Sequence, residues 1–259
     1  MMKREIDIFF TAVMFYTRIP CPKNISHDPD YLNRATRYFP LIGWIVGLIS
    51  FGAFYLGMWL GWGGYLAIIF SLAAGIWTTG AFHEDGLADV CDGFGGGWTK
   101  EKILTIMKDS RVGTYGVVGL LLVLLGKVFA LRAMVPLLVD YPLVGLLLFV
   151  NYHTLARLAA VNIVFTSEYA REDETSKAKP IAKSYSAKEV FWAYFLGLIP
   201  LVILAFVQWE FALVLLPLAL LVTYLRYYYN KWLGGYTGDC LGAAEQFGEL
   251  LVLLVFLSL

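Results

Sequence analysis

The chain has 259 residues, of which 59% are hydrophobic and 15% charged, and its mean hydropathy is +0.67. So few polar residues cannot cover the surface of a soluble domain, and the composition therefore predicts an integral membrane protein. The 20 basic and 20 acidic side chains give a formal net charge of zero, which argues against a nucleic-acid partner. The three cysteines form no CxxC pair and predict no disulfide framework.

The chain begins with MMKREIDIFFTAVMFYTRIP, which joins basic residues to a short apolar stretch. The stretch lacks a small-residue cleavage site, so we expect a retained helix that lies at the membrane surface or is partly buried. Seven later windows are apolar over the roughly 20 residues that a helix needs to cross a bilayer. They are residues 39–60, 64–82, 113–134, 143–165, 189–207, 211–230 and 241–259. The expected fold is an all-α, polytopic transmembrane helix bundle with about seven spans.

Basic residues are distributed unequally between the two ends of these spans. Every Lys and Arg except Lys127, Arg132 and Arg157 falls in the N-terminal segment or near the connections of one side. The connections GWG, VPLLVDYP and QWE on the other side contain none. Because cytoplasmic loops collect basic residues, we expect a cytoplasmic N-terminus and the acidic motifs at the cytoplasmic face. The long polar stretch SEYAREDETSKAKPIAKSYSAKE predicts a mobile connector or a lid over a substrate.

The motif HEDGLADVCDG follows the second apolar window directly. On a helix, Asp85, Asp89 and Asp92 lie at positions i, i+4 and i+7 and therefore share one face, where they repel one another. A hard divalent cation such as Mg²⁺ or Mn²⁺, shared with a phosphate, would relieve that repulsion. The simpler alternative is that the acids cap and solvate the end of the span. Gly86, Gly93 and residues 95–97 favour the metal hypothesis, because missing side chains would let an anion approach the backbone.

Two further ligand candidates in this motif are weaker. Glu84 points about a quarter turn away from the aspartate face, and His83 points nearly opposite to it. A zinc site formed by His83, Cys91 and Cys240 lacks any characteristic ligand spacing.

The next motif, KEKILTIMKDSRVGTYG, supplies cations for a phosphate. We expect Arg111 to grip two phosphate oxygens while Asp109 holds its guanidinium. The lysines of this motif fit the polar face of an amphipathic helix. Lys127 and Arg157 lie inside spans, where a charged group is usually paired or functional, although Arg157 is near enough to the cytoplasmic end to snorkel.

The last motif, GGYTGDCLGAAEQFGE, begins the final span. Thr237 or Asp239 is expected to cap this helix. Glu245 and Glu249 lie deeper on one face at positions i and i+4, and capping does not explain them.

These motifs resemble those of the cobalamin synthases, the adenosylcobinamide-GDP ribazoletransferases. TRIPCP, FPLIGWIVG, GAFHEDGLADVCDG, IMKDSRVGTYG and GGYTGDCLGAAEQFGELLVL occur in that order over most of the chain. The resemblance implies a multi-pass, Mg²⁺-dependent enzyme of the cell inner membrane, with residues 1–259 as one catalytic domain. Such an enzyme joins adenosylcobinamide-GDP to α-ribazole or its 5′-phosphate and releases GMP.

The resemblance also implies roles for individual residues. The acidic motif falls on Asp85, Asp89 and Asp92 as metal ligands, and Asp85, Asp89 and Arg111 are the expected catalytic residues. The expected substrate-binding residues are His83, Lys108, Asp109, Ser110, Arg157, Thr237 and Asp239. Glu84 departs from the family pattern, where an apolar residue is common.

Two other classes of protein remain as alternatives. A CDP-alcohol phosphotransferase acting on lipid also uses an acidic helical motif, but the DGxxAR pattern is missing here. A cation transporter would need acidic residues through the membrane, whereas these motifs gather at one face. The lipid bilayer is an expected partner of all three classes, and a homo-oligomer remains open.

Overall fold

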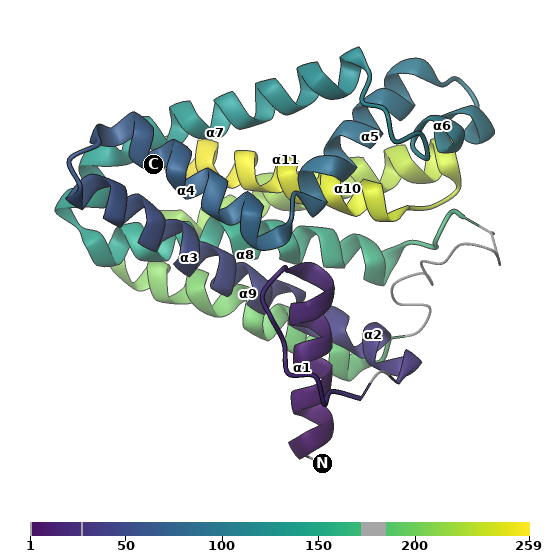
Figure 1. The fold of residues 1–259 in the computed structure, drawn as a ribbon, viewed down its shortest axis with the longest axis horizontal. Helices are drawn as coiled ribbons and strands as arrows, with labels where there is room; N and C mark the ends of the chain where they lie inside the picture. The colour runs from purple at the N-terminus through teal and green to yellow at the C-terminus, as the bar shows by residue number, and fades with distance from the viewer. Residues whose placement is uncertain (1, 27, 172–184) are drawn as a thin grey trace.

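The computed structural model describes residues 2–26, 28–171 and 185–259, and most of these residues lie in helices (Figure 1). The helices are α1 Met2–Tyr16, α2 Pro29–Ala35, η1 Thr36–Tyr38, α3 Phe39–Trp59, α4 Gly63–Thr79, α5 Phe82–Gly96, α6 Lys100–Ile106, α7 Thr114–Asp140, α8 Pro142–Thr166, α9 Ala187–Val207, η2 Trp209–Val214, α10 Leu215–Leu233 and α11 Gly238–Leu257. The expected all-α fold is confirmed for this part of the chain. Most of the polar stretch expected to form a connector or lid, residues 172–184, lies outside the described residues.

Six helical segments are long and apolar enough to cross a membrane. They are Asp30–Trp59, Thr114–Asp140, Pro142–Thr166, Ala187–Val207, Trp209–Leu233 and Gly238–Leu257. A seventh crossing is available if α4 and α5 count together, but their axes differ by 90°. The prediction of about seven apolar segments is therefore confirmed, with one of them broken.

The break between α4 and α5 has a backbone cause. Gly80 and Ala81 both adopt left-handed conformations, with φ of 70° and 59°. The Arg18 side chain packs so closely on Gly80 that a Cβ there would overlap it, and the Arg18 N–H donates to the Thr78 carbonyl at 2.7 Å. Glycine adopts this conformation without cost, whereas Ala81 adopts it against the preference of an L residue, and together they end α4 and redirect the chain into α5.

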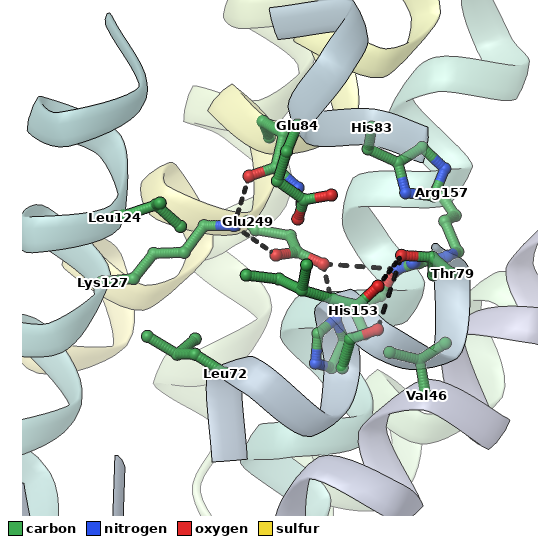
Figure 2. A pocket seen from close by; sticks show the side chains of 13 residues that line it. Val46, Leu72, Thr79, His83, Glu84, Leu124, Lys127, His153, Arg157 and Glu249 are labelled. Carbon is green, nitrogen blue, oxygen red and sulfur yellow. Dashed lines mark hydrogen bonds and ion pairs between the residues drawn. The ribbon is translucent and has the colours of Figure 1, made fainter. Parts of the chain in front are cut away.

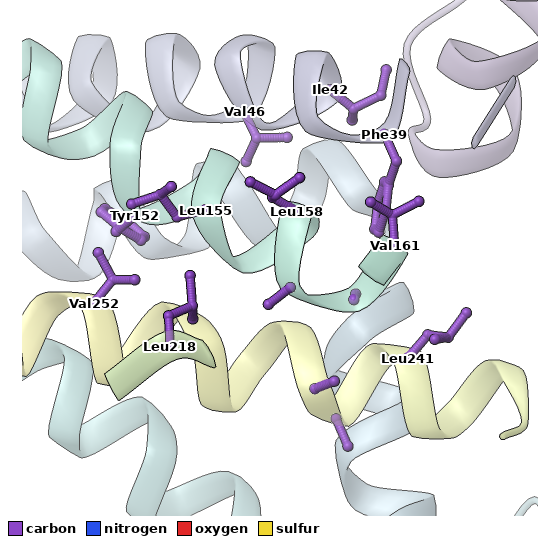
Figure 3. Packing of buried hydrophobic residues seen from close by; sticks show 14 of the residues in the cluster. Phe39, Ile42, Val46, Tyr152, Leu155, Leu158, Val161, Leu218, Leu241 and Val252 are labelled. Carbon is purple, nitrogen blue, oxygen red and sulfur yellow. The ribbon is translucent and has the colours of Figure 1, made fainter. Parts of the chain in front are cut away.

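The core is built around α8, which lies between α3 and α11 (Figure 3). Glycines permit the closest approach: a Cβ at Gly43 would lie 2.6 Å from the Thr154 Cα, and one at Gly47 would lie 2.7 Å from the Val150 Cα. α8 is consequently buried over 83% of its most apolar window. Its buried polar residues are thus held away from lipid.

The outer helices present apolar side chains outward, as a bilayer requires. Leu122 of α7 is 66% exposed, Phe206 of α9 is 88% exposed and Leu216 of α10 is 69% exposed. Trp59 and Trp209, at span ends, are also largely exposed, which is typical of the membrane interface. Helix α1 runs across the direction of the long helices (Figure 1).

Candidate active site

Helix α5 carries the acidic motif, and two glycines bring it against the start of α11. A Cβ at Gly86 would lie 2.9 Å from the Asp239 carbonyl oxygen, and one at Gly242 would lie 3.1 Å from the His83 carbonyl oxygen. The two backbones therefore touch, and this contact places Asp85 and Asp89 beside Asp239. Figure 1 shows α5, α6 and the first turns of α7 and α11 at the end of the bundle opposite the C-terminus.

The acidic site consists of Asp85, Asp89 and Asp239. Asp89 interacts electrostatically with both other carboxylates, and Asp239 interacts with Asp85. A cation that the sequence analysis missed also contributes, because Nη2 of Arg171 lies 2.7 Å from Oδ2 of Asp239. The two side chains are 68 positions apart, and no local pattern predicts their contact.

A short backbone pairing holds Arg171 at this site. Residues Tyr169 and Tyr236 form an isolated parallel β-bridge, in which the Ala170 N–H donates to the Tyr236 carbonyl and the Tyr236 N–H donates to the Glu168 carbonyl, each at 2.9 Å. Burial, more than the nearby charge of Asp239, raises the pKa of Tyr169. The phenol therefore stays protonated at neutral pH.

Asp92 lies on the same helix but is directed to a different partner. Its carboxylate accepts the N–H of Gly113 at 2.6 Å and the N–H of Gly116 at 2.9 Å. These are free N–H groups at the start of α7, so Asp92 caps that helix. The expected face of three aspartates is present on α5, but both oxygens of the third already have backbone partners.

The glycines of this motif serve protein packing. A Cβ at Gly93 would lie 2.8 Å from Met107, one at Gly95 would lie 2.5 Å from Tyr115 and one at Gly97 would lie 2.7 Å from Ile103. The expectation that these glycines open the backbone to an anion is wrong for these three positions. α6 and the start of α7 occupy that space.

Arg111 and Asp109 pair as expected. Nη2 of Arg111 donates to Asp109 at 2.7 Å and Nε donates at 3.0 Å, while the Arg111 side chain stays 87% exposed. These hydrogen bonds lower the pKa of Asp109 to about 2. An open cavity of about 450 Å³, lined by both residues and by Thr114 and Tyr115, lies beside the pair.

The same motif contains two other residues predicted to bind substrate, Lys108 and Ser110. Ser110 is exposed. Lys108 interacts electrostatically with Tyr169, which places Lys108 near Arg171.

A second charged cluster is buried among α5, α7, α8 and α11 (Figure 2). Glu249 lies 2.5 Å from both Lys127 and His153, and Arg157 lies 2.7 Å from Glu245. The cluster encloses a cavity of about 20 Å³, enough for roughly one water. Lys127 is therefore paired, as expected of a charge inside a span.

The snorkelling hypothesis for Arg157 is wrong, because the side chain is 1% exposed and its partners lie in the interior. His83, 2% exposed, faces Glu245 at 3.7 Å and not the aspartates. Thr237 caps α11 as expected, since its hydroxyl accepts the Cys240 N–H at 3.3 Å.

The residues whose spacing suits a metal ion are neither the three aspartates of α5 nor the zinc set that the sequence suggested. Among the described residues, only His153, Glu245 and Glu249 bring three ligand atoms within 4.8 Å of one another. Lys127 and Arg157 already pair with these two carboxylates, so no charge there needs a metal to balance it. The zinc set of His83, Cys91 and Cys240 is not brought together, and neither the three α5 aspartates nor the group of Asp85, Asp89 and Asp239 meets this distance.

The fold and site define a polytopic helical membrane protein with an acidic site, paired with Arg171, at one end of its bundle. The chain belongs to the cobalamin-5-phosphate synthase family, which it matches over residues 8–257. It is 43% identical over 256 residues to the adenosylcobinamide-GDP ribazoletransferase of Shewanella oneidensis, covering 98% of this chain and 95% of that protein. The protein of the same name from Shewanella frigidimarina is 44% identical with the same coverage. No solved structure matches the chain.

Proposed function

We propose that this protein is an adenosylcobinamide-GDP ribazoletransferase, which joins adenosylcobinamide-GDP to α-ribazole or its 5′-phosphate and releases GMP. The observation that carries the proposal is the full-length match to relatives of that name. The site adds independent support, because a group of carboxylates beside Arg171 suits the transfer of a phosphate group. The alternatives of a lipid phosphotransferase and a transporter have no such support.

In the proposed reaction a ribose hydroxyl of α-ribazole attacks the phosphate attached to cobinamide. A new P–O bond forms to the ribose oxygen, the bond to the GMP oxygen breaks, and the hydroxyl proton is released. Arg111 would grip phosphate oxygens while Asp109 orients its guanidinium. Because such a transfer needs little covalent help, the protein contributes mainly position and charge.

Mg²⁺ fits the acidic site by the chemistry of the donor atoms. Asp85, Asp89 and Asp239 offer only carboxylate oxygens, and Asp85 is exposed enough to leave room for water ligands. Mg²⁺ commonly takes one or two protein carboxylates together with substrate phosphates, so a complete protein ligand set is unnecessary. When bound, the ion would neutralise charge on the pyrophosphate. Asp92 is the weakest of the predicted ligands because it caps α7.

The distribution of charge supports a proposal for the location of the reaction. The basic residues gather near one end of the spans, and the positive-inside rule favours a cytoplasmic position for this end. We therefore propose a multi-pass enzyme with a cytoplasmic active site, and its family supports the cell inner membrane as its location.

The proposal is tested by incubating membranes that contain the protein with adenosylcobinamide-GDP, Mg²⁺ and either α-ribazole or its 5′-phosphate. We expect GMP release with at least one acceptor and none after chelation of divalent ions. Membranes lacking the protein give the background. Folded wild-type protein that releases no GMP above background with either acceptor would refute the function.

A further inference from the structure

Arg171 is the cation that the fold brings to the acidic site, although no motif contains it. Its Nη2 lies 2.7 Å from Asp239, and the two side chains are only 18% and 22% exposed. Its charge also acts on Asp89. A largely buried ion pair costs desolvation on both sides, so its presence beside further carboxylates calls for an explanation.

The backbone defines where Arg171 lies. The preceding residues pair with the chain just before α11, and the Tyr169 and Tyr236 rings meet edge to face at 5.6 Å. Gly235 makes this pairing possible, because any Cβ there would overlap the Glu168 carbonyl. The backbone pairing therefore fixes the main chain next to Arg171 and directs its guanidinium to the acidic site.

Among the described residues, the site brings Arg171 to a group of carboxylates. Asp85 and Asp239 act electrostatically on Asp89, and Arg171 pairs with Asp239. The Nε atom of Arg171 is buried and, among the described residues, finds no acceptor. An unpaired buried donor is costly, and a ligand oxygen would satisfy it.

We propose that Arg171 binds a pyrophosphate oxygen of adenosylcobinamide-GDP, and that its pairing with Asp239 is the arrangement adopted without metal and substrate. The proposal rests on the function proposed above. Asp85, Asp89 and Asp239 would hold a divalent ion, whose charge would weaken their attraction for the guanidinium, and Arg171 would then pair with two phosphate oxygens. Arg171 thus balances the acids in the resting site and the phosphates in the loaded one.

The test compares purified Arg171→Gln, Arg171→Lys and wild-type protein in two binding measurements. The first is binding of Mn²⁺ alone. The second is binding of adenosylcobinamide-GDP, or of α-ribazole 5′-phosphate, with Mg²⁺ present. Arg34→Gln is the control, because it breaks a 2.5 Å pair with Asp30 outside the site.

We expect Arg171→Gln to bind Mn²⁺ several-fold more tightly, because the competing cation is gone. The same variant should bind adenosylcobinamide-GDP roughly 10- to 100-fold more weakly, with α-ribazole 5′-phosphate unaffected. Arg171→Lys keeps the charge but loses the planar pair of donors, so its affinity for adenosylcobinamide-GDP should lie between those of the wild type and Arg171→Gln. The control should match the wild type.

Weaker binding of both Mn²⁺ and adenosylcobinamide-GDP would overturn the proposal, because Arg171 would then only hold Asp239 in position. Unchanged binding of both would also overturn it, because Arg171 would then have no role at the site. Weaker binding of α-ribazole 5′-phosphate alone would overturn its assignment to the donor. Wild-type protein without GMP release refutes the proposed function, while the binding arms still decide the role of Arg171. Normal GMP release with unchanged binding in both variants refutes only the role of Arg171.

Discussion

Arg111 presents a guanidinium to solvent beside an open cavity while Asp109 holds its orientation. Arg111→Lys keeps the charge but loses the planar pair of donors. We therefore expect a lower kcat/KM, corresponding to a loss of about 1–3 kcal/mol of transition-state stabilisation. GMP release at varied donor concentration measures this effect. Arg34→Lys, in a similar pair with Asp30, serves as the control and should retain full activity. Wild-type kinetics in Arg111→Lys would reduce Arg111 to a surface cation.

Asp89 belongs to the group of facing carboxylates, whose repulsion a divalent ion would relieve. We expect Asp89→Asn to abolish turnover and to leave the fold intact, with an equal or higher Tm when Mg²⁺ is absent. Added Mg²⁺ should raise the Tm of the wild type more than that of the variant, because binding to the folded state stabilises it. Thermal unfolding with and without Mg²⁺ checks this. If Asp89→Asn loses stability and activity together, and Mg²⁺ raises its Tm as much as that of the wild type, the acidic residues are structural caps.

Asp92 differs from Asp89 because its two oxygens accept N–H groups from the start of α7. We expect Asp92→Ala to lower the free energy of unfolding by about 1–2 kcal/mol, as loss of a helix cap does. Chemical unfolding in detergent measures the change. If stability is instead retained while the Mg²⁺ response of the Tm is lost, Asp92 is a metal ligand, as the sequence analysis expected.

At the scale of helices, the contact of α5 with α11 sets the spacing of the acidic site. Gly86→Ala adds a Cβ that would lie 2.9 Å from the Asp239 carbonyl oxygen, so the helices must separate. We expect a loss of about 1–3 kcal/mol in stability together with reduced GMP release. Gly52→Ala is the matched control, because nothing lies within 4 Å of its added Cβ. Equal behaviour of the two variants would show that close packing at Gly86 is unimportant.

The buried cluster joins four helices through charges that lipid cannot solvate. Lys127→Met removes one of the two 2.5 Å partners of Glu249 and the positive charge of Lys127, and we expect a loss of about 3–5 kcal/mol in stability. Combining Lys127→Met with Glu249→Gln should recover part of that loss, because the carboxylate that Lys127 balanced is then also removed. Unfolding of the two single variants and the double variant gives the coupling energy. Additive losses would contradict an interaction between the two side chains.

For the whole molecule, the distribution of basic residues predicts its orientation in the membrane. We expect a cysteine at Ser110, which is exposed between α6 and α7, to react with an impermeant thiol reagent only from the cytoplasmic side. A cysteine at Trp62, exposed between α3 and α4, should react only from the periplasmic side. The wild type, with its three native cysteines, gives the background. The reverse pattern would overturn the topology and move the active site outside.

Much of this architecture could be predicted from the sequence because it depends on local composition. A span needs a certain length of apolar residues, so each predicted window corresponds to a helical segment in the structure. The pairing of Arg111 with Asp109 was also predictable, since two residues so close along the chain meet whatever the rest of the fold does. The hydrophobic effect and short-range geometry are properties of a segment, and the segment alone reveals them.

Only the tertiary structure decided which charges meet. Arg171 reaches Asp239 because a β-bridge joins two distant connections, and Arg157 is buried because α11 brings Glu245 to it. The sequence could not show that Asp92 would face the start of α7, nor whether a glycine leaves space for a ligand or for a neighbouring helix. A buried charge is stable only beside a partner, and that partner is determined by packing between helices, which no single segment contains.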